Sequence, residues 1–136
     1  MSSTLTLILT LTLTLTLTLT LTQTLTLTLT LTLTLTRCAA MYAEVIGRTA
    51  RLVAAWQSVG FVHGVLNTDN MALTGDTIDY GPFGFLNCYD EDCTPNTSDA
   101  VRRYSYANQP RACHFNLERL AEALAPLLPK EEASLV

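Results

Sequence analysis

The sequence predicts a small α+β fold that follows a low-complexity N-terminal tract. Two segments with the apolar spacing of amphipathic helices, residues 38–59 and 112–125, flank a β-hairpin pattern at residues 71–80. All 8 Lys and Arg residues and all 12 Asp and Glu residues stand after residue 36. We therefore expect a tract at 1–36, a folded domain at 37–129 with one modest core, and a frayed tail at 130–136.

The tract is a Leu-Thr repeat at residues 4–36, broken at Ile8 and Gln23. Alternation is the period of a strand, but no Gly or Pro marks a turn and the run far exceeds an ordinary strand of about 3–10 residues. A helix would spread Leu over every face. Three interpretations stay open: low-complexity sequence without a function, a membrane-associated segment, or a strand. We favour the first, since regular hydroxyl groups argue against a membrane span.

Each predicted helix has an apolar face and a charged face. Gly60 is expected to end the first helix, residues 38–59, and Pro126 to end the second, residues 112–125. The side chains predicted to point inward from the first helix are Met41, Val45, Leu52, Val53 and Trp56. Those predicted to point inward from the second are Phe115, Leu117, Leu120 and Leu124.

Between the helices, two short strands at residues 71–74 and 77–80 are joined by Gly75-Asp76, which is a hairpin signal. Residues 82–110 read as a long loop, and its aromatic content favours a packed one. We expect the aromatic side chains here to anchor the loop and core rather than to stack on a base: Tyr80, Phe83 and Phe85.

Acidic residues dominate the middle of the chain, because no Lys or Arg occurs between Leu52 and Val101. The acids there are Asp69, Asp76, Asp79, Asp90, Glu91, Asp92 and Asp99. Residues 90–92 read as a solvated loop. Asp69 beside Asn70, and Asp79, stand instead at predicted strand ends, where carboxylate and amide oxygens are ligands for hard cations such as Mg²⁺. Magnesium commonly takes one or two protein carboxylates together with phosphate oxygens.

The spacing of these residues matches a phosphoryl-transfer template. Protein kinases carry His-Arg-Asp-x-x-x-x-Asn followed by Asp-Phe-Gly. Here the step from His63 to Asn70 is the same, and residues 79–81 (Asp-Tyr-Gly) stand in the place of Asp-Phe-Gly. Val65 occupies the position of the catalytic Asp, so either the chemistry is lost or Asp69 performs it from a new place.

The literal string is more specific, and residues 39–128 resemble the selenoprotein O family. The resemblance lies in WQSVGFVHGVLNTDNMALTGDTIDYGPFGFL and in four shorter strings after it: Asn96-Thr97-Ser98-Asp99, Arg103-Tyr104, Asn108-Gln109-Pro110 and Asn116-Leu-x-Arg-Leu. It implies part of a protein-kinase-like C-terminal lobe: helix, catalytic loop, hairpin, activation segment and helix. It also implies a pseudokinase that transfers AMP from ATP to Ser, Thr or Tyr hydroxyls of proteins. We expect no nucleic-acid partner, because the composition rules out a polybasic nucleic-acid binder.

The resemblance implies roles for three residues. Asp69 matches the proton acceptor for the attacking hydroxyl, Asn70 a magnesium ligand, and Asp79 the magnesium ligand that contacts ATP through the metal. His63 matches an anchor of the catalytic loop. Eukaryotic members of the family are mitochondrial and bacterial members cytoplasmic, and the resembling stretch does not choose between them.

The residues before Arg37 depart from the family pattern. A Gly-rich loop, a phosphate-pairing Lys with its Glu, and phosphate-gripping Arg residues would precede it, where only Leu and Thr stand. We expect the chain as written to be a fragment that does not transfer AMP alone. Two alternatives stay open: an enzyme completed by another chain, and a non-catalytic module in which the tract drives membrane or β association.

Overall fold

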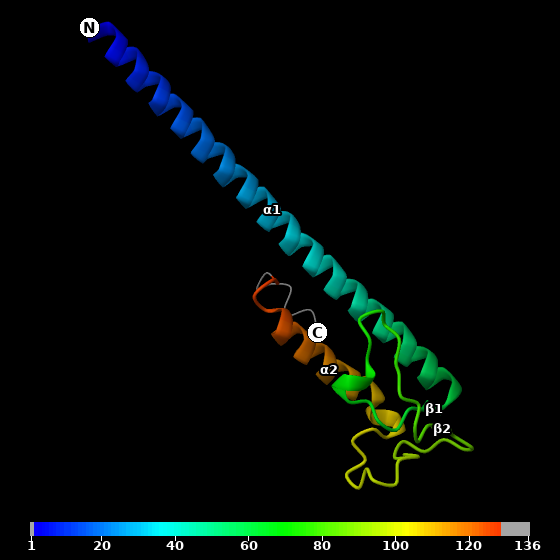
Figure 1. Cartoon of the computed structure of the whole chain (residues 1–136). Helices are drawn as coiled ribbons and strands as arrows, with labels where there is room; N and C mark the ends of the chain where they lie inside the picture. Colours follow the sequence, from blue (N-terminus) through cyan, green and yellow to red (C-terminus); the bar gives the residue numbers. More distant parts are fainter. Residues whose placement is uncertain (1, 129–136) are drawn as a thin grey trace. The chain divides into compact units, whose positions relative to one another are not determined.

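The computed structural model describes residues 2–128, and the predicted tail at 130–136 lies outside them. The elements in chain order are α1 (Ser2–Val59), β1 (Phe61–Val62), η1 (Thr68–Asn70), β2 (Gly84–Phe85), η2 (Tyr106–Asn108) and α2 (Gln109–Leu124) (Figure 1). The η elements are short 3₁₀ helices. The chain divides into two compact units, Met1–Arg37 and Cys38–Val136.

The first unit is helical, so the strand interpretation of the Leu-Thr tract is wrong. Thr hydroxyls along the tract donate to the carbonyl oxygen four residues earlier, as Thr14 does to Thr10 and Thr34 to Thr30, both at 2.9 Å. The Leu side chains stay in solvent, with exposed fractions of 50–72% from Leu7 to Leu33. Among the described residues no second strand lies beside the tract. A helix satisfies its main chain internally, whereas a lone strand would not.

The length and apolar composition of Thr6–Val59 would allow this helix to cross a membrane. It is the one helix among the described residues of which this is true. Signal sequences near an N-terminus and the core helices of soluble proteins have the same length and composition, so this property alone does not distinguish between them.

The core of the second unit lies between the C-terminal part of α1 and α2. One cluster contains Val53, Trp56, Phe61, Leu66, Ala112 and Cys113. The other contains Ala39, Tyr42, Ala121 and Leu128. The end of α1 thus packs on the beginning of α2, and Ala39 and Tyr42 of α1 pack near the end of α2. These two helical segments are therefore antiparallel, as Figure 1 shows for the green part of α1 and the orange α2.

Polar bonds reinforce this packing. Tyr42 donates its hydroxyl to the carbonyl oxygen of Leu117 at 3.2 Å. The Gln57 amide donates to the carbonyl oxygen of Tyr106, and the Tyr106 hydroxyl donates back to that of Gln57, both at 2.7 Å. Because the second pair joins α1 to η2, it fixes the end of the long loop against the helix.

Most of the predicted inward positions are confirmed, and two are wrong. Val45, Val53, Trp56 and Leu117 are buried, and Leu52, Leu120 and Leu124 are half-buried. Met41 and Phe115 are each 38% exposed. The α2 residues that join the two buried clusters are small, Ala112, Cys113 and Ala121, whereas the larger Phe115 lies on the exposed side of the helix.

Two boundaries also differ from the sequence prediction. The second helix begins at Gln109 rather than at residue 112, because Pro110 lies in the first turn, where its missing N–H needs no partner. The predicted hairpin is confirmed at its turn, where Ala72 N–H donates to Asp76 O at 2.9 Å, but its strands shrink to one bridge between Met71 and Thr77.

The sheet itself forms elsewhere. β1 and β2 pair antiparallel, with Phe61 opposite Phe85 and Val62 opposite Gly84. Two residues per strand carry too little alternation to be seen in the sequence. This pairing closes the segment from His63 to Phe83 into one loop, which contains every residue predicted to perform chemistry.

Candidate functional site

His63 directly follows β1, is fully buried, and contacts three separate segments around this loop. Its ring accepts the N–H of Val65 at Nδ1 (3.3 Å) and contacts the carbonyl oxygen of Ile78 through Nε2 (3.0 Å). The two partners therefore assign the proton to Nε2. Burial lowers the pKa of His63, against the opposite influence of the Ile78 carbonyl and of Asp79. A neutral ring bonded on both sides is an anchor, as the resemblance implied.

Two polar side chains of α2 form hydrogen bonds to the main chain of the same loop and of β1. Gln109 is fully buried, accepts the N–H of His63 at 2.9 Å and donates to the carbonyl oxygen of Phe61 at 2.9 Å. Asn116 donates to the carbonyl oxygen of Leu66 at 3.0 Å. The sequence prediction contains neither role, because it begins the helix at residue 112 and so leaves Gln109, seven residues before Asn116 on the same face, outside it.

Gly64 fixes the path of the main chain between His63 and the candidate site residues Asp69 and Asn70. Its φ is +82°, and a Cβ there would lie 2.9 Å from the carbonyl oxygen of Pro82, so a larger residue would collide with main chain. The carbonyl oxygen of Gly64 accepts the side-chain N–H of Asn96 at 3.0 Å. In the sequence, Gly64 occupies the position of the Arg in the kinase motif.

Asn70 lies in η1, is buried, and is held on both its side chain and its main chain. Its amide nitrogen donates to the carbonyl oxygen of Val65 at 2.9 Å, which leaves the amide oxygen as the atom able to bind a cation. Its own carbonyl oxygen accepts the N–H of Ile78 at 3.0 Å and the hydroxyl of Thr77 at 2.6 Å. The segment that carries Asp69 and Asn70 is thereby tied to the segment that carries Asp79.

Asp69 and Asp79 are both exposed. Within residues 2–128, neither carboxylate forms a hydrogen bond or an ion pair. Asp79 has a φ of +58°, which is uncommon outside glycine, and its carbonyl oxygen accepts the N–H of Gly81 at 2.8 Å. Residues held in this region cluster at functional sites. The structure thus joins the three predicted site residues by main-chain bonds while leaving both carboxylates available.

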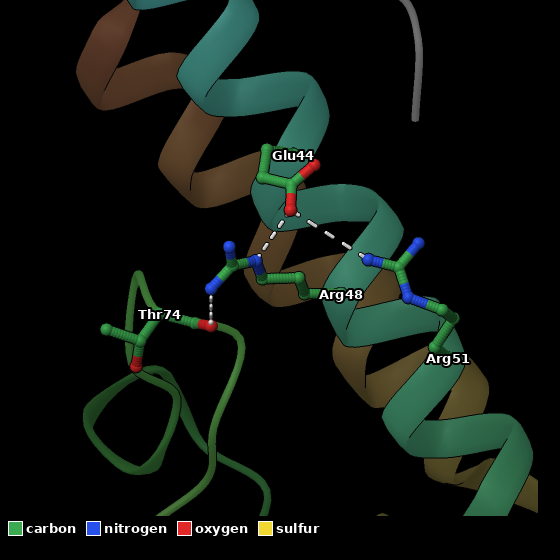
Figure 2. Close-up of polar contacts among 4 residues, drawn as sticks. All are labelled: Glu44, Arg48, Arg51 and Thr74. Atoms are coloured by element: carbon green, nitrogen blue, oxygen red, sulfur yellow. Dashed lines mark hydrogen bonds and ion pairs between the residues drawn. The ribbon is translucent and has the colours of Figure 1, made fainter.

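The turn of the hairpin is braced by α1 (Figure 2). Arg48 donates from Nη1 to the carbonyl oxygen of Thr74 at 3.2 Å, while its Nε lies 2.7 Å from Oε1 of Glu44. Arg51 lies 3.9 Å from the same carboxylate oxygen. The hydrogen bond from Arg48 lowers the pKa of Glu44, so the carboxylate stays charged and orients the guanidinium toward the turn.

Aromatic side chains of the loop gather around Phe61 of β1. Phe61 lies 6.1 Å from Tyr80, 6.0 Å from Phe83 and 5.3 Å from Phe85, measured between ring centroids. Tyr80 also lies 5.2 Å from the ring of His63. Their packing on β1 agrees with the predicted anchoring role, although each of the three keeps about half of its surface exposed, from 49% to 60%.

Comparison with known proteins decides the family. The model of the family described as protein adenylyltransferase SelO matches residues 20–135. The chain belongs to the SelO family. It is 62% identical over 95 residues to the human protein adenylyltransferase SelO, mitochondrial, and 59% identical over 100 residues to the zebrafish SelO-1 protein, also named mitochondrial. It is 57% identical over 94 residues to the protein nucleotidyltransferase YdiU of Xanthomonas axonopodis.

These matches cover different shares of the chain and of its SelO relatives. They span 70%, 74% and 68% of this chain, but 14% of the human protein, 14% of the zebrafish protein and 18% of the bacterial one. The chain therefore corresponds to less than a fifth of the length of these relatives, and within it lies the loop from His63 to Gly81.

Proposed function

We propose that this chain carries the base and the metal-binding segment of a protein adenylyltransferase on part of a kinase-like C-terminal lobe. The proposal is supported by membership of the SelO family and by relatives named for protein adenylyltransferase or nucleotidyltransferase activity. ATP and a protein hydroxyl group are the proposed substrates. The order of elements in the second unit, helix, loop, hairpin turn, long loop and helix, is consistent with such a lobe.

The observation that carries the proposal is the main-chain link between Asn70 and the hairpin. The bond from Ile78 N–H to the carbonyl oxygen of Asn70 places Asp79 one residue beyond a fixed contact with Asn70, and Asp69 one residue before it. Both carboxylates are exposed, and the bond from the buried Asn70 side chain to Val65 uses its amide nitrogen rather than its amide oxygen. Positioning of this kind is the main contribution that a protein makes to transfer of a phosphorus group.

In the proposed reaction, the carboxylate of Asp69 accepts the proton of the attacking hydroxyl. The hydroxyl oxygen then bonds to the α-phosphorus of ATP, and the bond from that phosphorus to pyrophosphate breaks. The products are AMP esterified to the protein, pyrophosphate and the protonated carboxyl group of Asp69.

Asn70 and Asp79 fit a magnesium ion that is shared with phosphate oxygens. No group of three or more His, Cys, Asp and Glu side chains among the described residues forms a site for a metal ion by itself. One amide and one carboxylate oxygen nevertheless match the few protein ligands that magnesium takes beside a nucleotide. When bound, magnesium would neutralise phosphate charge, and the two residues would hold it there.

A chimera tests the proposal directly. Residues 38–128 replace the matching segment of the human SelO protein, and transfer of radiolabelled AMP from ATP to protein is measured with magnesium. We expect the chimera to retain activity, and Asp69→Asn and Asp79→Asn each to lower the rate by at least about a hundredfold. Asp76→Asn is the matched control, because Asp76 is an exposed acid of the same hairpin, and it should change the rate less than about twofold.

Two results would count against the proposal. One is an active chimera in which Asp79→Asn transfers AMP at the unsubstituted rate. The other is an inactive chimera whose thermal unfolding matches that of the human protein, because the segment would then fold without supplying the site.

A further inference from the structure

A hollow of about 360 Å³ lies beside the first turns of α2. Its apolar lining comes from Leu66, Val101 and Phe115, and its polar lining from Arg103, Asn108 and Arg111. We call this hollow the arginine groove. Its volume is far larger than a single inorganic ion requires and lies within the range of ligand pockets, roughly 300–1,000 Å³.

The groove concentrates positive charge. Four of the eight basic residues of the chain fall within residues 102–119, immediately after the stretch without any. Arg102 pairs with Asp92 at 3.3 Å and Arg119 with Glu122 at 2.8 Å. In the part of the chain that the structure describes, Arg103 and Arg111 form no ion pair. Two guanidinium groups that share one hollow without a carboxylate favour an anionic ligand.

Arg103 is held in place before any ligand arrives. Its main-chain N–H donates to Oδ1 of Asp99 at 3.0 Å, and the N–H of Tyr104 donates to Oδ2 at 2.8 Å. The guanidinium carbon lies 5.5 Å from the ring centroid of Tyr104 and 5.3 Å from that of Phe115. Stacking on ring faces leaves the N–H edge of a guanidinium able to bind a carboxylate in a bidentate manner.

The groove adjoins the loop that carries the proposed base. Leu66 lines the groove, and its carbonyl oxygen is bonded to Asn116 of α2 at 3.0 Å. Asp69 follows Leu66 in the next turn of the same loop. The groove therefore shares with the proposed base the chain segment from Leu66 to Asp69.

We propose that the arginine groove binds an acidic segment of the protein substrate and presents a nearby hydroxyl group to Asp69. This inference rests on the proposed adenylyltransferase function. The mixture of two cations with apolar walls suits a peptide in which acidic and apolar side chains alternate. A nucleic acid fits less well, because the chain has a net charge of −4 and the acids of residues 52–101 would repel a continuous phosphate backbone.

Fluorescence anisotropy with the full chain, in the absence of nucleotide, tests the inference. The probe is a fluorescein-labelled peptide in which Glu alternates with Leu around one Tyr, and a second peptide has Gln in place of each Glu. We expect Arg111→Glu to weaken binding of the Glu peptide about tenfold, because it replaces an attraction with a repulsion. The Gln peptide should bind the unsubstituted chain at least about tenfold more weakly than the Glu peptide does.

The control variants separate the groove from overall charge and from folding. Arg51→Glu makes the same change of charge on an exposed residue of α1 and should alter binding less than about twofold. Arg111 lies in the first turn of α2, where Glu is favoured by the helix dipole, so the variant should keep its helical circular dichroism. Arg103→Gln should also weaken binding of the Glu peptide, whereas Arg111→Lys should keep most of the affinity for that peptide.

Three outcomes would overturn the inference: equal weakening by Arg51→Glu and Arg111→Glu, equal binding of the two peptides, or Arg111-dependent binding of oligouridylate that is tighter than that of the Glu peptide. Because no ATP is present, failure of AMP transfer in the chimera leaves this measurement intact. Conversely, an active chimera whose chain does not bind the Glu peptide overturns the groove alone.

Discussion

His63 shows how one buried residue can join the chain segments that carry the candidate site. Through its ring and its main chain it contacts Val65 in its own loop, Ile78 in the hairpin and Gln109 in α2. Each of these bonds satisfies a polar group that would otherwise be buried without a partner, at a cost of about 1–3 kcal/mol each. We infer that His63 is a positioning residue for Asp69 and Asp79.

This role predicts a pH dependence of stability. Burial lowers the pKa of His63 below its ordinary value of 6.5, so the unfolded chain binds the proton more readily than the folded one. The stabilisation is therefore complete above that ordinary value and is lost as the pH falls through the lowered pKa. In urea titrations without metal, we expect the unfolding midpoint to be lower at about pH 5.5 than at about pH 7.5.

The other imidazole provides the control for this titration. His114 lies on the exposed side of α2, 3.8 Å from Glu118. His114→Asn should keep the decrease of the midpoint between the two pH values, whereas His63→Asn should lower the midpoint at both and remove most of the difference. An unchanged pH dependence in His63→Asn would show that another group causes it.

At the scale of elements, the contact between Arg48 and the hairpin turn predicts that replacing Gly75 by Ala destabilises the fold more than replacing Gly81 does. Gly75 has a φ of +80°, and a Cβ there would lie 2.2 Å from Cβ of Arg48, which is main-chain-proximal and cannot move away. Gly81, at the other end of the hairpin, has no atom within 4 Å of such a Cβ. We expect Gly75→Ala to lower the free energy of unfolding by at least about 2 kcal/mol.

Gly81→Ala should change the free energy of unfolding by less than about 0.5 kcal/mol, which makes it a matched control in the same hairpin. Urea denaturation followed by circular dichroism measures both variants. If both glycines tolerate Ala equally, α1 does not brace the turn in the way that Figure 2 shows.

Elements with a long apolar period were predictable from the sequence, and short or polar ones were not. Val53, Trp56 and Leu117 were placed correctly because 16 or more helical residues repeat the pattern. The β1–β2 pair was missed because a strand of two residues, Phe61–Val62, has no period to detect. Phe115 was misplaced because its size suggested burial, whereas packing selected the smaller Ala112 and Cys113 for the interface.

In the candidate site too, the sequence predicted some features and left others undetected. Asp69, Asn70 and Asp79 were identified from residue type, spacing and resemblance. Their mutual arrangement depends on the bond between Ile78 and Asn70, which joins residues through a turn and leaves no trace in composition. The buried amides that support the site from α2 were missed because a polar residue on an apolar face is usually assigned to the surface.

At the scale of the whole molecule, the Leu-Thr tract exposes a large apolar surface that nothing in its own unit covers. Its Leu side chains are 50–72% exposed from Leu7 to Leu33, while its Thr hydroxyls are turned back onto the main chain. Apolar surface of this extent drives association in water. We expect the full chain to self-associate in sedimentation equilibrium, and a chain of residues 38–136 to be monomeric.

One variant distinguishes association through the Leu side chains from association through the main chain of the tract. In a variant with Gln in place of every Leu of residues 9–33, helix propensity is nearly unchanged while the apolar surface is removed. This variant should be monomeric and should share the urea midpoint of the 38–136 chain, because the clusters around Trp56 and Tyr42 contain no residue of the first unit. If the Gln variant associates as strongly as the natural tract, main-chain pairing rather than the Leu surface is responsible, and the helical form of the tract would not persist in the assembly.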